Sequence, residues 1–378
     1  MIRIGITGQS GFIGTHLHNF LGIQSEVLIV PFEDDFFESK EKLQSFVKQC
    51  DVIVHLAALN RHGNPQVIYD TNIRLTKQII DACENSNSYP HILFSSSTQE
   101  DGNNLYGKSK YDGRKMMESW AERNNAKFTG LIIPNVFGPF GNPYYNSFIA
   151  TFCHQLTHNE TPNIDVDSEV KLIYVGELVK EIYDYILIMK DEETKNPMID
   201  EVRIRYTSEY KVSSILNILN NFKSCYFEKG IIPDLSDVFE KNLFHTFLCY
   251  IDLKTFFPFY LKKHSDERGS FVETVKLNSG GQISFSNTVP GITRGNHFHT
   301  RKAERFAVIK GKARIELRKI GTSEILSFEL DGDKPSFVDM PIWYTHNITN
   351  IGNEELYTIF WINEHYNPED GDTFFEGV

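Results

Sequence analysis

Three histidines and one glutamate form the clearest chemical pattern in the sequence. His297 and His299 alternate with Phe298 in GNHFHTRKAE, Glu304 follows, and His346 lies further on in YTHNITN. If the first stretch is a β-strand, its alternation places both imidazoles on one face. Three imidazoles and a carboxylate are a ligand set for zinc or for another divalent metal such as iron, manganese, nickel or copper. The pattern therefore predicts a clustered metal site.

A glycine-rich stretch near the start of the chain is the second chemical pattern. TGQSGFIG spaces Gly8, Gly11 and Gly14 as GxxGxxG between a strand-like segment and a helix-like segment that opens with Phe12 and Ile13. Glycine lets the backbone turn tightly and approach a pyrophosphate, while the helix N-terminus offers N–H groups and the positive end of its dipole. A tight structural turn is the alternative. We predict that these five residues line a dinucleotide site.

A tyrosine and a lysine in YGKSK form the third pattern. Tyr106 and Lys110 are four residues apart, so they share one face of a helix. An ammonium beside a phenol stabilises the phenolate, which would let Tyr106 exchange a proton near neutral pH. The strand-like FSSST ends shortly before the tyrosine and offers hydroxyls from Ser95 to Thr98. We predict that Ser97, the third serine, orients a substrate carbonyl.

The first two thirds of the chain contain the elements that must position the glycine and tyrosine patterns. Strand-like stretches alternate with helix-like stretches such as GTHLHNFLGI, NIRLTKQIIDACEN and YGKSKYDGRKMMESWAERNN; the strand-like stretches are IRIGIT, EVLIV, DVIVHLAA, HILFSSS and FTGLIIP. This rhythm predicts a Rossmann-type α/β fold, with a doubly wound parallel sheet between helices. We assign it to residues 1–252.

The histidine pattern lies in a different kind of sequence. Beyond about residue 250, the chain alternates short strand-like stretches with turns, and no long amphipathic helix is evident; examples are GQISFSNTV, ERFAVIKGKARIELRKI, EILSFEL and LYTIFWIN. Many short strands at this spacing predict an all-β sandwich or barrel. We assign this domain to residues 253–378.

Composition excludes several classes of function. The chain has 378 residues, a formal net charge of -12 and five cysteines. A net acidic chain disfavours general nucleic-acid binding, because phosphates require a basic surface. No apolar run approaches the roughly 18 residues that a membrane helix requires, and the cysteines show no disulfide or CxxC spacing. These features predict a cytoplasmic protein that binds neither nucleic acid nor membrane.

Residues 1–252 resemble the extended short-chain dehydrogenases/reductases, which modify nucleotide sugars. TGQSGFIG, DVIVHLAA, TNIRLT, LFSSS, YGKSK and PNVFGP match motifs of that family in order. The resemblance implies that Ser97, Tyr106 and Lys110 form the catalytic set. It also implies the following contacts: Gly8, Gly11 and Gly14 at the pyrophosphate, Asp51 near the adenine, Ala57 and Ala58 along the cofactor cleft, Asn72 supporting the catalytic water network, and Asn135 at the substrate.

The choice between NADPH and NADH is usually read just after the second strand. A basic residue there favours the 2′-phosphate of NADPH, and an acidic residue favours the free ribose of NADH. The stretch EVLIVPFEDDF contains no arginine or lysine. We predict NADP(H) from the family resemblance, with NADH as the alternative.

Residues 253–378 resemble the cupin superfamily, whose fold is a jelly roll. The first cupin motif, G-x5-HxH-x4-E-x6-G, is matched from Gly291 to Gly311, and the second is matched at Gly332, Pro341, His346 and Asn350. The resemblance implies one divalent metal, zinc or another, bound by His297, His299, Glu304 and His346. The spacer between Gly332 and Pro341 is longer than usual, and Trp343 replaces a common glycine.

The stretch TRGNHFH is also similar to the nucleotide-sugar 3,5-epimerases, which are cupins. In those enzymes the histidine that matches His297 is a base that removes a proton next to a ketone. His297 therefore has two candidate roles, metal ligand or general base. A nitrogen that is bound to a metal cannot also accept a proton, so the two roles exclude each other at one nitrogen.

The whole chain resembles the bifunctional capsular-polysaccharide enzymes of the UDP-N-acetyl-L-fucosamine route. VHLAALNR, NVFGPFGNPYYNSFIATFC and DLSDVFEKNLFHTFLCY carry this resemblance. It implies that the cupin domain epimerises C3 of a UDP-4-keto-6-deoxy-N-acetylhexosamine and that NAD(P)H then reduces the C4 ketone, which gives UDP-2-acetamido-2,6-dideoxy-L-talose. Asn146 and Ser147 would contact the sugar; a buried aromatic helix start is the alternative for this segment.

A ketone explains why both patterns occur in one chain. Epimerisation next to a carbonyl requires that carbonyl to accept negative charge, and reduction then removes the carbonyl and fixes the new configuration. Two other functions remain: a reductase with a non-catalytic, metal-stabilised cupin dimerisation domain, and a sugar-nucleotide sensor. The predicted partners are a UDP-sugar and further copies of the chain, as a homodimer or larger homo-oligomer through the cupin domain.

Overall fold

The computed structural model describes residues 1–191, 198–267 and 269–378. Its internal contacts divide the chain into two compact units. Unit 1 contains residues 1–148 and 168–211, and unit 2 contains residues 149–167 and 212–378. Much of the chain before the predicted boundary at 252/253 therefore packs with the second unit, while the boundary itself stays a prediction. Each unit is described by itself.

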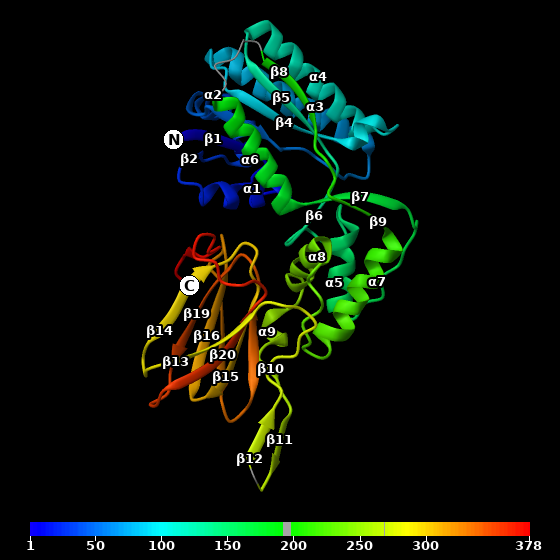
Figure 1. The fold of residues 1–378 in the computed structure, drawn as a ribbon. Helices are drawn as coiled ribbons and strands as arrows, with labels where there is room; N and C mark the ends of the chain where they lie inside the picture. Colours follow the sequence, from blue (N-terminus) through cyan, green and yellow to red (C-terminus); the bar gives the residue numbers. More distant parts are fainter. Residues whose placement is uncertain (192–197, 268) are drawn as a thin grey trace. The chain divides into compact units, whose positions relative to one another are not determined.

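Unit 1 is built on a six-stranded parallel sheet with the order β2-β1-β3-β4-β5-β8 (Figure 1). Its strands are rich in Val, Ile and Leu because both faces of the sheet are covered. The predicted Rossmann-type fold class is confirmed. The strands are β1 (Ile2–Thr7), β2 (Val27–Val30), β3 (Val52–His55), β4 (His91–Ser97), β5 (Lys127–Ile133) and β8 (Met198–Arg203).

Helices pack on the two faces of this sheet in two separate hydrophobic clusters. On one face, α1 (Phe12–Gly22) and α6 (Val175–Asp191) place Leu17 and Leu178 against the strands. The other face carries Phe46, Ile79 and Trp120, which come from three further helices. These helices are α2 (Lys40–Gln49), α3 (Pro65–Ser86) and α4 (Leu105–Asn124).

Three short elements complete unit 1. A small sheet joins β6, β7 and β9, with β6 parallel to β7 and β9 antiparallel to it. Two 3-10 turns, η1 (Asp34–Glu38) and η2 (Thr98–Asp101), follow β2 and β4. The bounds of the small sheet are β6 (Asn135–Phe137), β7 (Glu169–Tyr174) and β9 (Ser208–Lys211).

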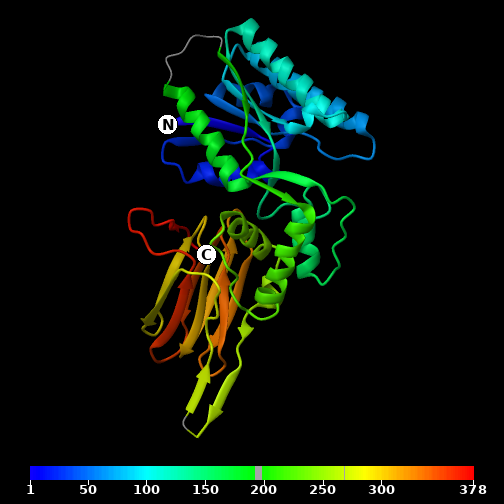
Figure 2. The same cartoon turned by 45° about the vertical axis from the view of Figure 1, so that its right-hand side comes forward.

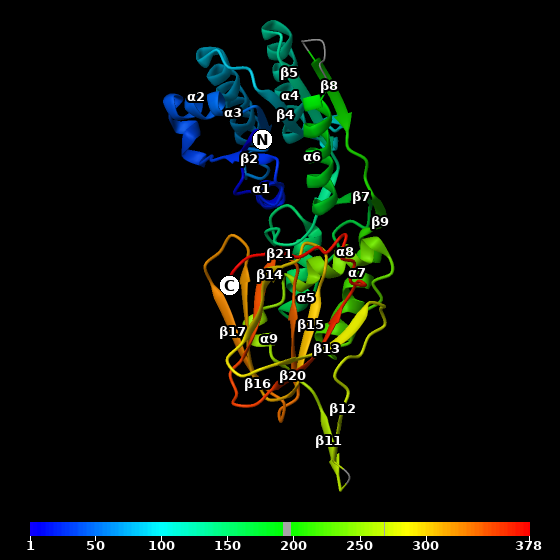
Figure 3. The ribbon, with the colours of Figure 1, turned by 60° about the vertical axis from the view of Figure 1, so that its left-hand side comes forward.

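Unit 2 consists of a β domain and a group of helices. Two five-stranded antiparallel sheets form the β domain, with the orders β10-β18-β15-β20-β13 and β17-β16-β19-β14-β21 (Figure 3). This arrangement confirms the predicted all-β character of the C-terminal part. The strands are β10 (Phe259–Tyr260), β13 (Gln282–Thr288), β14 (Thr293–Phe298), β15 (Glu304–Lys310), β16 (Lys312–Lys319), β17 (Ile325–Asp331), β18 (Ser336–Met340), β19 (Tyr344–Asn350), β20 (Leu356–Ile362) and β21 (Phe374–Phe375).

The remaining elements of unit 2 are a hairpin and a group of helices, which all precede β13 in the sequence. The hairpin of β11 (Lys263–Asp266) and β12 (Gly269–Val272) extends from the rest of the unit (Figure 2). The helices are α5 (Phe148–Thr157), α7 (Val212–Phe222), α8 (Val238–Leu248) and α9 (Leu253–Phe256), with a π-helical turn at Lys223–Phe227. Within the described residues, no helix is both long and apolar enough to cross a membrane.

A buried ion pair joins the helices of unit 2 to the β domain. Arg305 of β15, which is 1% exposed, donates to both carboxylate oxygens of Asp339 on β18, at 2.7 and 2.8 Å. Its third nitrogen donates to the carbonyl of Gly230 at 2.6 Å, and the Tyr226 hydroxyl donates to Asp339 at 2.5 Å. These bonds hold the segment around residues 226–230 against the sheet.

Candidate functional site

The glycine loop of unit 1 lies between β1 and α1 and has no room for larger side chains. Gly8 has a φ of +72°, and a Cβ there would lie 2.8 Å from the backbone of Ala57. A Cβ on Gly14 would lie 2.1 Å from the Gly8 carbonyl oxygen. The loop therefore packs directly on the segment after β3, and the first turn of α1 follows it. This cradle fits the pyrophosphate of a dinucleotide.

The structure brings most of the predicted cofactor residues to this edge of the sheet. Phe12 and Ile13 begin α1, and Ala57 donates its N–H to the Thr7 hydroxyl at the end of β1, at 3.3 Å. Ala58 follows Ala57 directly. The carboxyl ends of parallel strands share one edge, which is where ligands of such sheets bind.

Asp51 does not belong to this group, contrary to the prediction from the family resemblance. It precedes β3, so it lies at the amino ends of the strands, where its carboxylate pairs with the Arg3 guanidinium at 2.6 Å. The carboxylate beside the glycine loop is instead that of Asp34, which accepts a hydrogen bond from the Ser10 hydroxyl at 3.2 Å. The acidic run after the second strand was the sequence signal for Asp34, because that strand ends at the edge of the sheet where the cofactor is expected to bind.

The predicted catalytic pair, Tyr106 and Lys110, lies at the start of α4. Lys110 is buried, and its ammonium donates to the Ser95 carbonyl at 2.9 Å. Burial lowers the pKa of Lys110 to about 8 and raises the pKa of the half-buried Tyr106 to about 12. We expected the lysine to lower the pKa of the tyrosine, but burial dominates here. Tyr106 is therefore protonated at neutral pH, which suits a proton donor.

The three consecutive serines of β4 have different hydrogen bonds. Ser95 donates its hydroxyl to the His55 carbonyl at 3.1 Å, and Ser96 donates to the Glu100 carboxylate at 2.5 Å. Ser97 only accepts, from the backbone N–H of Gln99 at 3.2 Å. Among the described residues, the Ser97 hydroxyl proton has no acceptor, so it remains available to a substrate carbonyl. This geometry supports the choice of Ser97.

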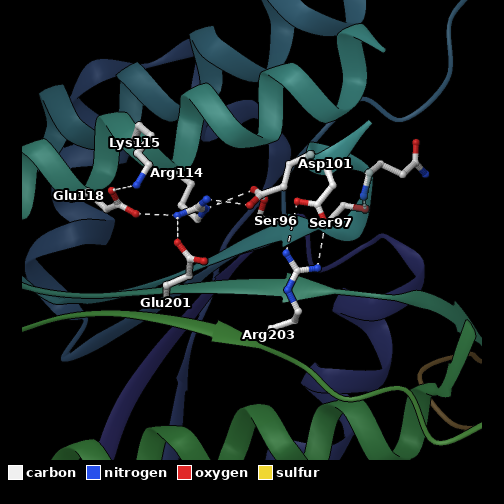
Figure 4. A network of polar contacts seen from close by, with 10 residues as sticks. Ser96, Ser97, Asp101, Arg114, Lys115, Glu118, Glu201 and Arg203 are labelled. Atoms are coloured by element: carbon white, nitrogen blue, oxygen red, sulfur yellow. Dashed lines mark hydrogen bonds and ion pairs between the residues drawn. The ribbon is translucent and has the colours of Figure 1, made fainter. Parts of the chain in front are cut away.

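A charged network fixes the turn after Ser97 against α4 (Figure 4). The buried Arg114 guanidinium contacts Glu100 at 2.7 Å, Glu118 at 2.8 Å and Glu201 at 2.5 Å. A second pair, Arg203 with Asp101, holds the end of the same turn at 3.0 Å. The sequence analysis missed this network, although Arg114 lies one helical turn beyond Lys110 on the same face.

Asn72 connects the loop after β3 to α4. Its side-chain oxygen accepts from the Leu59 N–H at 2.7 Å. Its amide donates to the Leu59 carbonyl at 3.1 Å and to the Ser109 hydroxyl at 2.9 Å. Asn72 is 4% exposed. In this structure it holds α3, the loop and α4 together through direct contacts.

The predicted sugar contacts lie on exposed segments. Asn135 begins β6, and Asn146 precedes α5, with the half-buried Ser147 beside it. Tyr144 and Tyr145 are 50% and 40% exposed, which excludes them from a buried helix start. The guanidinium of Arg61 donates to the carbonyls of these two tyrosines at 2.7 and 2.6 Å. Arg61, which the sequence analysis did not single out, thus fixes this segment.

The predicted metal ligands come together between the two sheets of the β domain. The register pairs His297 of β14 with His346 of β19, His299 follows β14, and Glu304 begins β15 of the other sheet. One ligand atom of each residue lies within 4.8 Å of those of the other three. The Glu304 carboxylate is 3.0 Å from His346 Nε2 and 3.5 Å from His299 Nε2.

The donor atoms of this cluster fit a divalent metal. Apart from these contacts with one another, His299 Nε2, His346 Nε2 and one Glu304 oxygen are buried without a hydrogen-bond partner among the described residues. The Nδ1 atoms of the two histidines contact the carbonyls of Asp372, at 2.5 Å, and Tyr344, at 3.2 Å. A carbonyl can only accept, so both rings donate from Nδ1 and keep the Nε2 lone pair. Nitrogen and oxygen lone pairs that converge in this way are suited to zinc.

Burial and mutual contacts shift the protonation of the cluster. Burial, together with the neighbouring His346 and His299, lowers the pKa of His297 to about 4. Burial by itself would raise the pKa of Glu304, but its interactions with His299 and His346 outweigh burial and bring it well below its usual value. The carboxylate is therefore ionised near neutral pH, as a metal ligand must be.

Two family models match the chain. The model of the NAD dependent epimerase/dehydratase family covers residues 4–197, and the Polysaccharide biosynthesis C-terminal domain covers residues 264–374. The first match contains the glycine loop and the tyrosine–lysine pair. The second contains the histidine–glutamate cluster. The two candidate sites therefore lie in two separately recognised sequence domains.

Two relatives match this chain over nearly its full length, and a third matches part of it. UDP-2-acetamido-2,6-beta-L-arabino-hexul-4-ose reductase of Pseudomonas aeruginosa is 30% identical, over 99% of this chain and 98% of its own. The crystal structure of the capsular polysaccharide assembling protein CapF from Staphylococcus aureus is 35% identical, with a TM-score of 0.61 over 100% of both chains. The spore coat polysaccharide biosynthesis protein SpsL of Bacillus subtilis is 29% identical over 30% of this chain and 81% of its own.

Proposed function

Because the chain belongs to the NAD dependent epimerase/dehydratase family and, over its full length, to the capsular nucleotide-sugar enzymes, we propose that it epimerises and then reduces one keto-sugar. The substrate is a UDP-4-keto-6-deoxy-N-acetylhexosamine. Epimerisation at C3 followed by reduction at C4 gives UDP-2-acetamido-2,6-dideoxy-L-talose. The observation that carries the proposal is the presence, in one chain, of a tyrosine–lysine pair and a glycine loop in unit 1 and of a histidine–glutamate cluster in the β domain.

The reductive half is assigned to unit 1. The nicotinamide cofactor supplies the hydride. Ser97 donates its uncommitted hydroxyl to the C4 carbonyl, and Tyr106 transfers its proton to the same oxygen as negative charge develops there. Lys110 is a buried cation one turn away, and its charge favours the phenolate that this transfer leaves. Burial, which raises the pKa of Tyr106 to about 12, keeps the proton in place before reaction.

The epimerising half is assigned to the β domain. A proton next to a ketone becomes acidic because the carbonyl oxygen takes up the charge of the enolate. A divalent metal bound by the cluster supplies a Lewis acid for such a carbonyl. His297 is the least buried of the four residues, so it is the ligand or the base that faces the substrate side. The β domain as a metal-stabilised dimerisation module is the alternative.

The side chains around the glycine loop bear on the choice of reductant. NADP(H) was the prediction from the family resemblance. The segment of residues 4–39 contains no arginine or lysine, and the carboxylate of Asp34 bonds Ser10 inside the loop. An acidic side chain beside the loop favours a free ribose hydroxyl and repels a 2′-phosphate. These contacts support NADH, which was the alternative, over NADPH.

One experiment tests both halves separately. The protein is incubated with the UDP-4-keto-6-deoxy-N-acetylhexosamine in deuterated water with NADH or NADPH, and products are followed by NMR. We expect deuterium at C3 and hydride delivery at C4. Tyr106→Phe should abolish oxidation of the nicotinamide and leave C3 exchange intact, and His297→Asn should stop C3 exchange.

The outcomes distinguish the alternatives. Cofactor oxidation without any C3 exchange in the wild-type protein would identify the β domain as a non-catalytic module. Binding of the UDP-sugar without oxidation or exchange would identify a sensor. Normal cofactor consumption by Tyr106→Phe would contradict the assignment of the proton donor.

A further inference from the structure

The segment from Asp370 to Val378 lies along the strand that carries the candidate metal ligands. Its short strand β21 pairs with β14, in a register that places Phe375 opposite His297 and Phe374 opposite Phe298 (Figure 3). The rings of Phe374 and Phe298 stack with centroids 5.3 Å apart. The Thr345 hydroxyl also donates to the Glu376 carbonyl. These contacts hold the segment in one position beside the cluster.

Asp372 directly contacts His299, one of the predicted metal-binding residues. Its backbone carbonyl lies 2.5 Å from His299 Nδ1. Because a carbonyl has no proton to give, Nδ1 carries the hydrogen, and in the neutral ring the lone pair lies on Nε2. That atom faces Glu304 at 3.5 Å. The carbonyl of Asp372 therefore selects the one tautomer of His299 that can bind an ion at the cluster.

The carboxylate of Asp372 anchors the same carbonyl. It accepts the backbone N–H groups of Thr300 at 3.1 Å, Arg301 at 3.0 Å and Lys302 at 3.2 Å, and the Thr300 hydroxyl at 2.6 Å. These three residues form most of the turn between the ligands His299 and Glu304. Asp372 is 6% exposed, so the four bonds are shielded from water. One residue thus fixes both the turn and the orientation of the imidazole.

We propose that Asp372 is a positioning residue of the metal centre in the β domain. Its carboxylate orders the turn that joins His299 to Glu304, and its carbonyl sets the His299 tautomer for a divalent cation. The inference rests on the metal site of the proposed function, but it concerns binding of the ion rather than the reaction. A partner that orients a metal-binding histidine typically changes metal affinity by about 10–100-fold when it is removed.

Metal affinity tests this role in the full-length protein. Zinc and cobalt affinities are measured by competition with a chromogenic chelator for the wild type, Asp372→Ala and Asp370→Ala. Asp370 is the matched control because it lies on the same segment but pairs with the exposed side of Arg301, at 2.7 Å. We expect Asp372→Ala to bind either ion about 10–100-fold more weakly and Asp370→Ala to match the wild type.

A second measurement does not depend on the variant folding. Histidine-selective nitrogen NMR of the metal-free wild-type protein reports directly which ring nitrogen of His299 carries the proton. For the neutral ring, hydrogen on Nδ1 supports the inference, and hydrogen on Nε2 in place of Nδ1 overturns it. Equal metal affinity of Asp372→Ala and the wild type would also overturn it.

The two proposals fail in different ways. Tight metal binding that depends on Asp372, together with an absence of C3 exchange, would contradict the proposed epimerisation and leave the positioning role intact. A wild-type protein that binds neither zinc nor cobalt would overturn the positioning role, while reduction by unit 1 would still be measured by cofactor oxidation.

Discussion

At the level of single residues, three buried histidines make the stability of the folded chain depend on pH. Burial lowers the pKa of His55 to about 3, of His91 to about 4 and of His245 to about 3. Each folded-state pKa lies below the ordinary value of 6.5, so the unfolded chain binds more protons than the folded chain. The stability that depends on the neutral rings is fully present above 6.5 and is lost as the pH falls toward the folded-state values.

His245 is the residue at which this effect is easiest to test. It is 2% exposed on α8, and its Nε2 has no hydrogen-bond partner in the described residues. His245→Met removes the proton-binding group and retains an apolar side chain that fills the site. We expect the wild type to lose about 2 kcal/mol more stability than this variant between about pH 8 and about pH 5. Urea unfolding at each pH measures the difference.

Two results would decide the role of His245. A pH dependence of the variant that parallels the wild type would contradict a buried neutral imidazole at this position. A smaller loss in the variant, with equal m-values, would support it, because equal m-values mean that the unfolding transition exposes the same surface.

At the scale of elements, the contact between η2 and α4 sets the distance between the proposed catalytic groups. Ser97 precedes η2, and Tyr106 is the second residue of α4. Gly107 packs so closely that a Cβ would lie 1.9 Å from the carbonyl oxygen of Gln99. Arg114 and Glu100 join the two elements by a buried ion pair at 2.7 Å. Both contacts hold Tyr106 near the end of β4.

Gly107→Ala should displace the start of α4 from the turn. We expect the rate of cofactor oxidation to fall by about 100-fold, because a shift of about 1 Å between reacting groups has an effect of that size. Gly22→Ala is the matched control, since a Cβ on this glycine at the end of α1 would meet nothing within 4 Å. Steady-state kinetics and the crystal structure of the variant measure the effect, and an unchanged rate would contradict the argument.

At the scale of the whole molecule, the chain passes between its two units more than once. Residues 149–167 and 212–252 pack with the β domain in unit 2, although the sequence pattern groups them with the Rossmann-type part. Part of this packing with the β domain is explained by the bonds of Arg305 to Asp339 and to the Gly230 carbonyl. Self-association through the β domain stays a prediction, which sedimentation would measure.

Because Arg305 and Asp339 form a buried ion pair, we expect the helices and the β domain of unit 2 to lose structure together. Arg305→Ala leaves the Asp339 carboxylate buried without its cationic partner, which typically has a cost of about 3–5 kcal/mol. Hydrogen exchange followed by mass spectrometry should show lower protection in residues 212–252 together with the β domain, and unchanged protection in residues 1–148. Loss of protection confined to residues 253–378 would instead support a boundary at 252/253.

The fold class and the predicted members of both candidate sites could be read from local patterns in the sequence. Strand and helix periodicity depends on neighbours in the chain, so β1, α4 and β15 are readable without tertiary contacts. The spacing of the glycines and of His297 with His299 is equally local. These patterns also indicated the pair of Tyr106 and Lys110, because residues four apart share a helix face.

Contacts between residues that are far apart in the sequence became known only from the tertiary structure. It placed Asp51 at the amino ends of the strands and Asp34 beside the glycine loop. In the described part of the chain it gives the Ser97 hydroxyl proton no acceptor, and it brings Asp372 to His299 across 73 residues. Such contacts depend on strand direction, register and burial, which arise only when segments far apart in the sequence pack together.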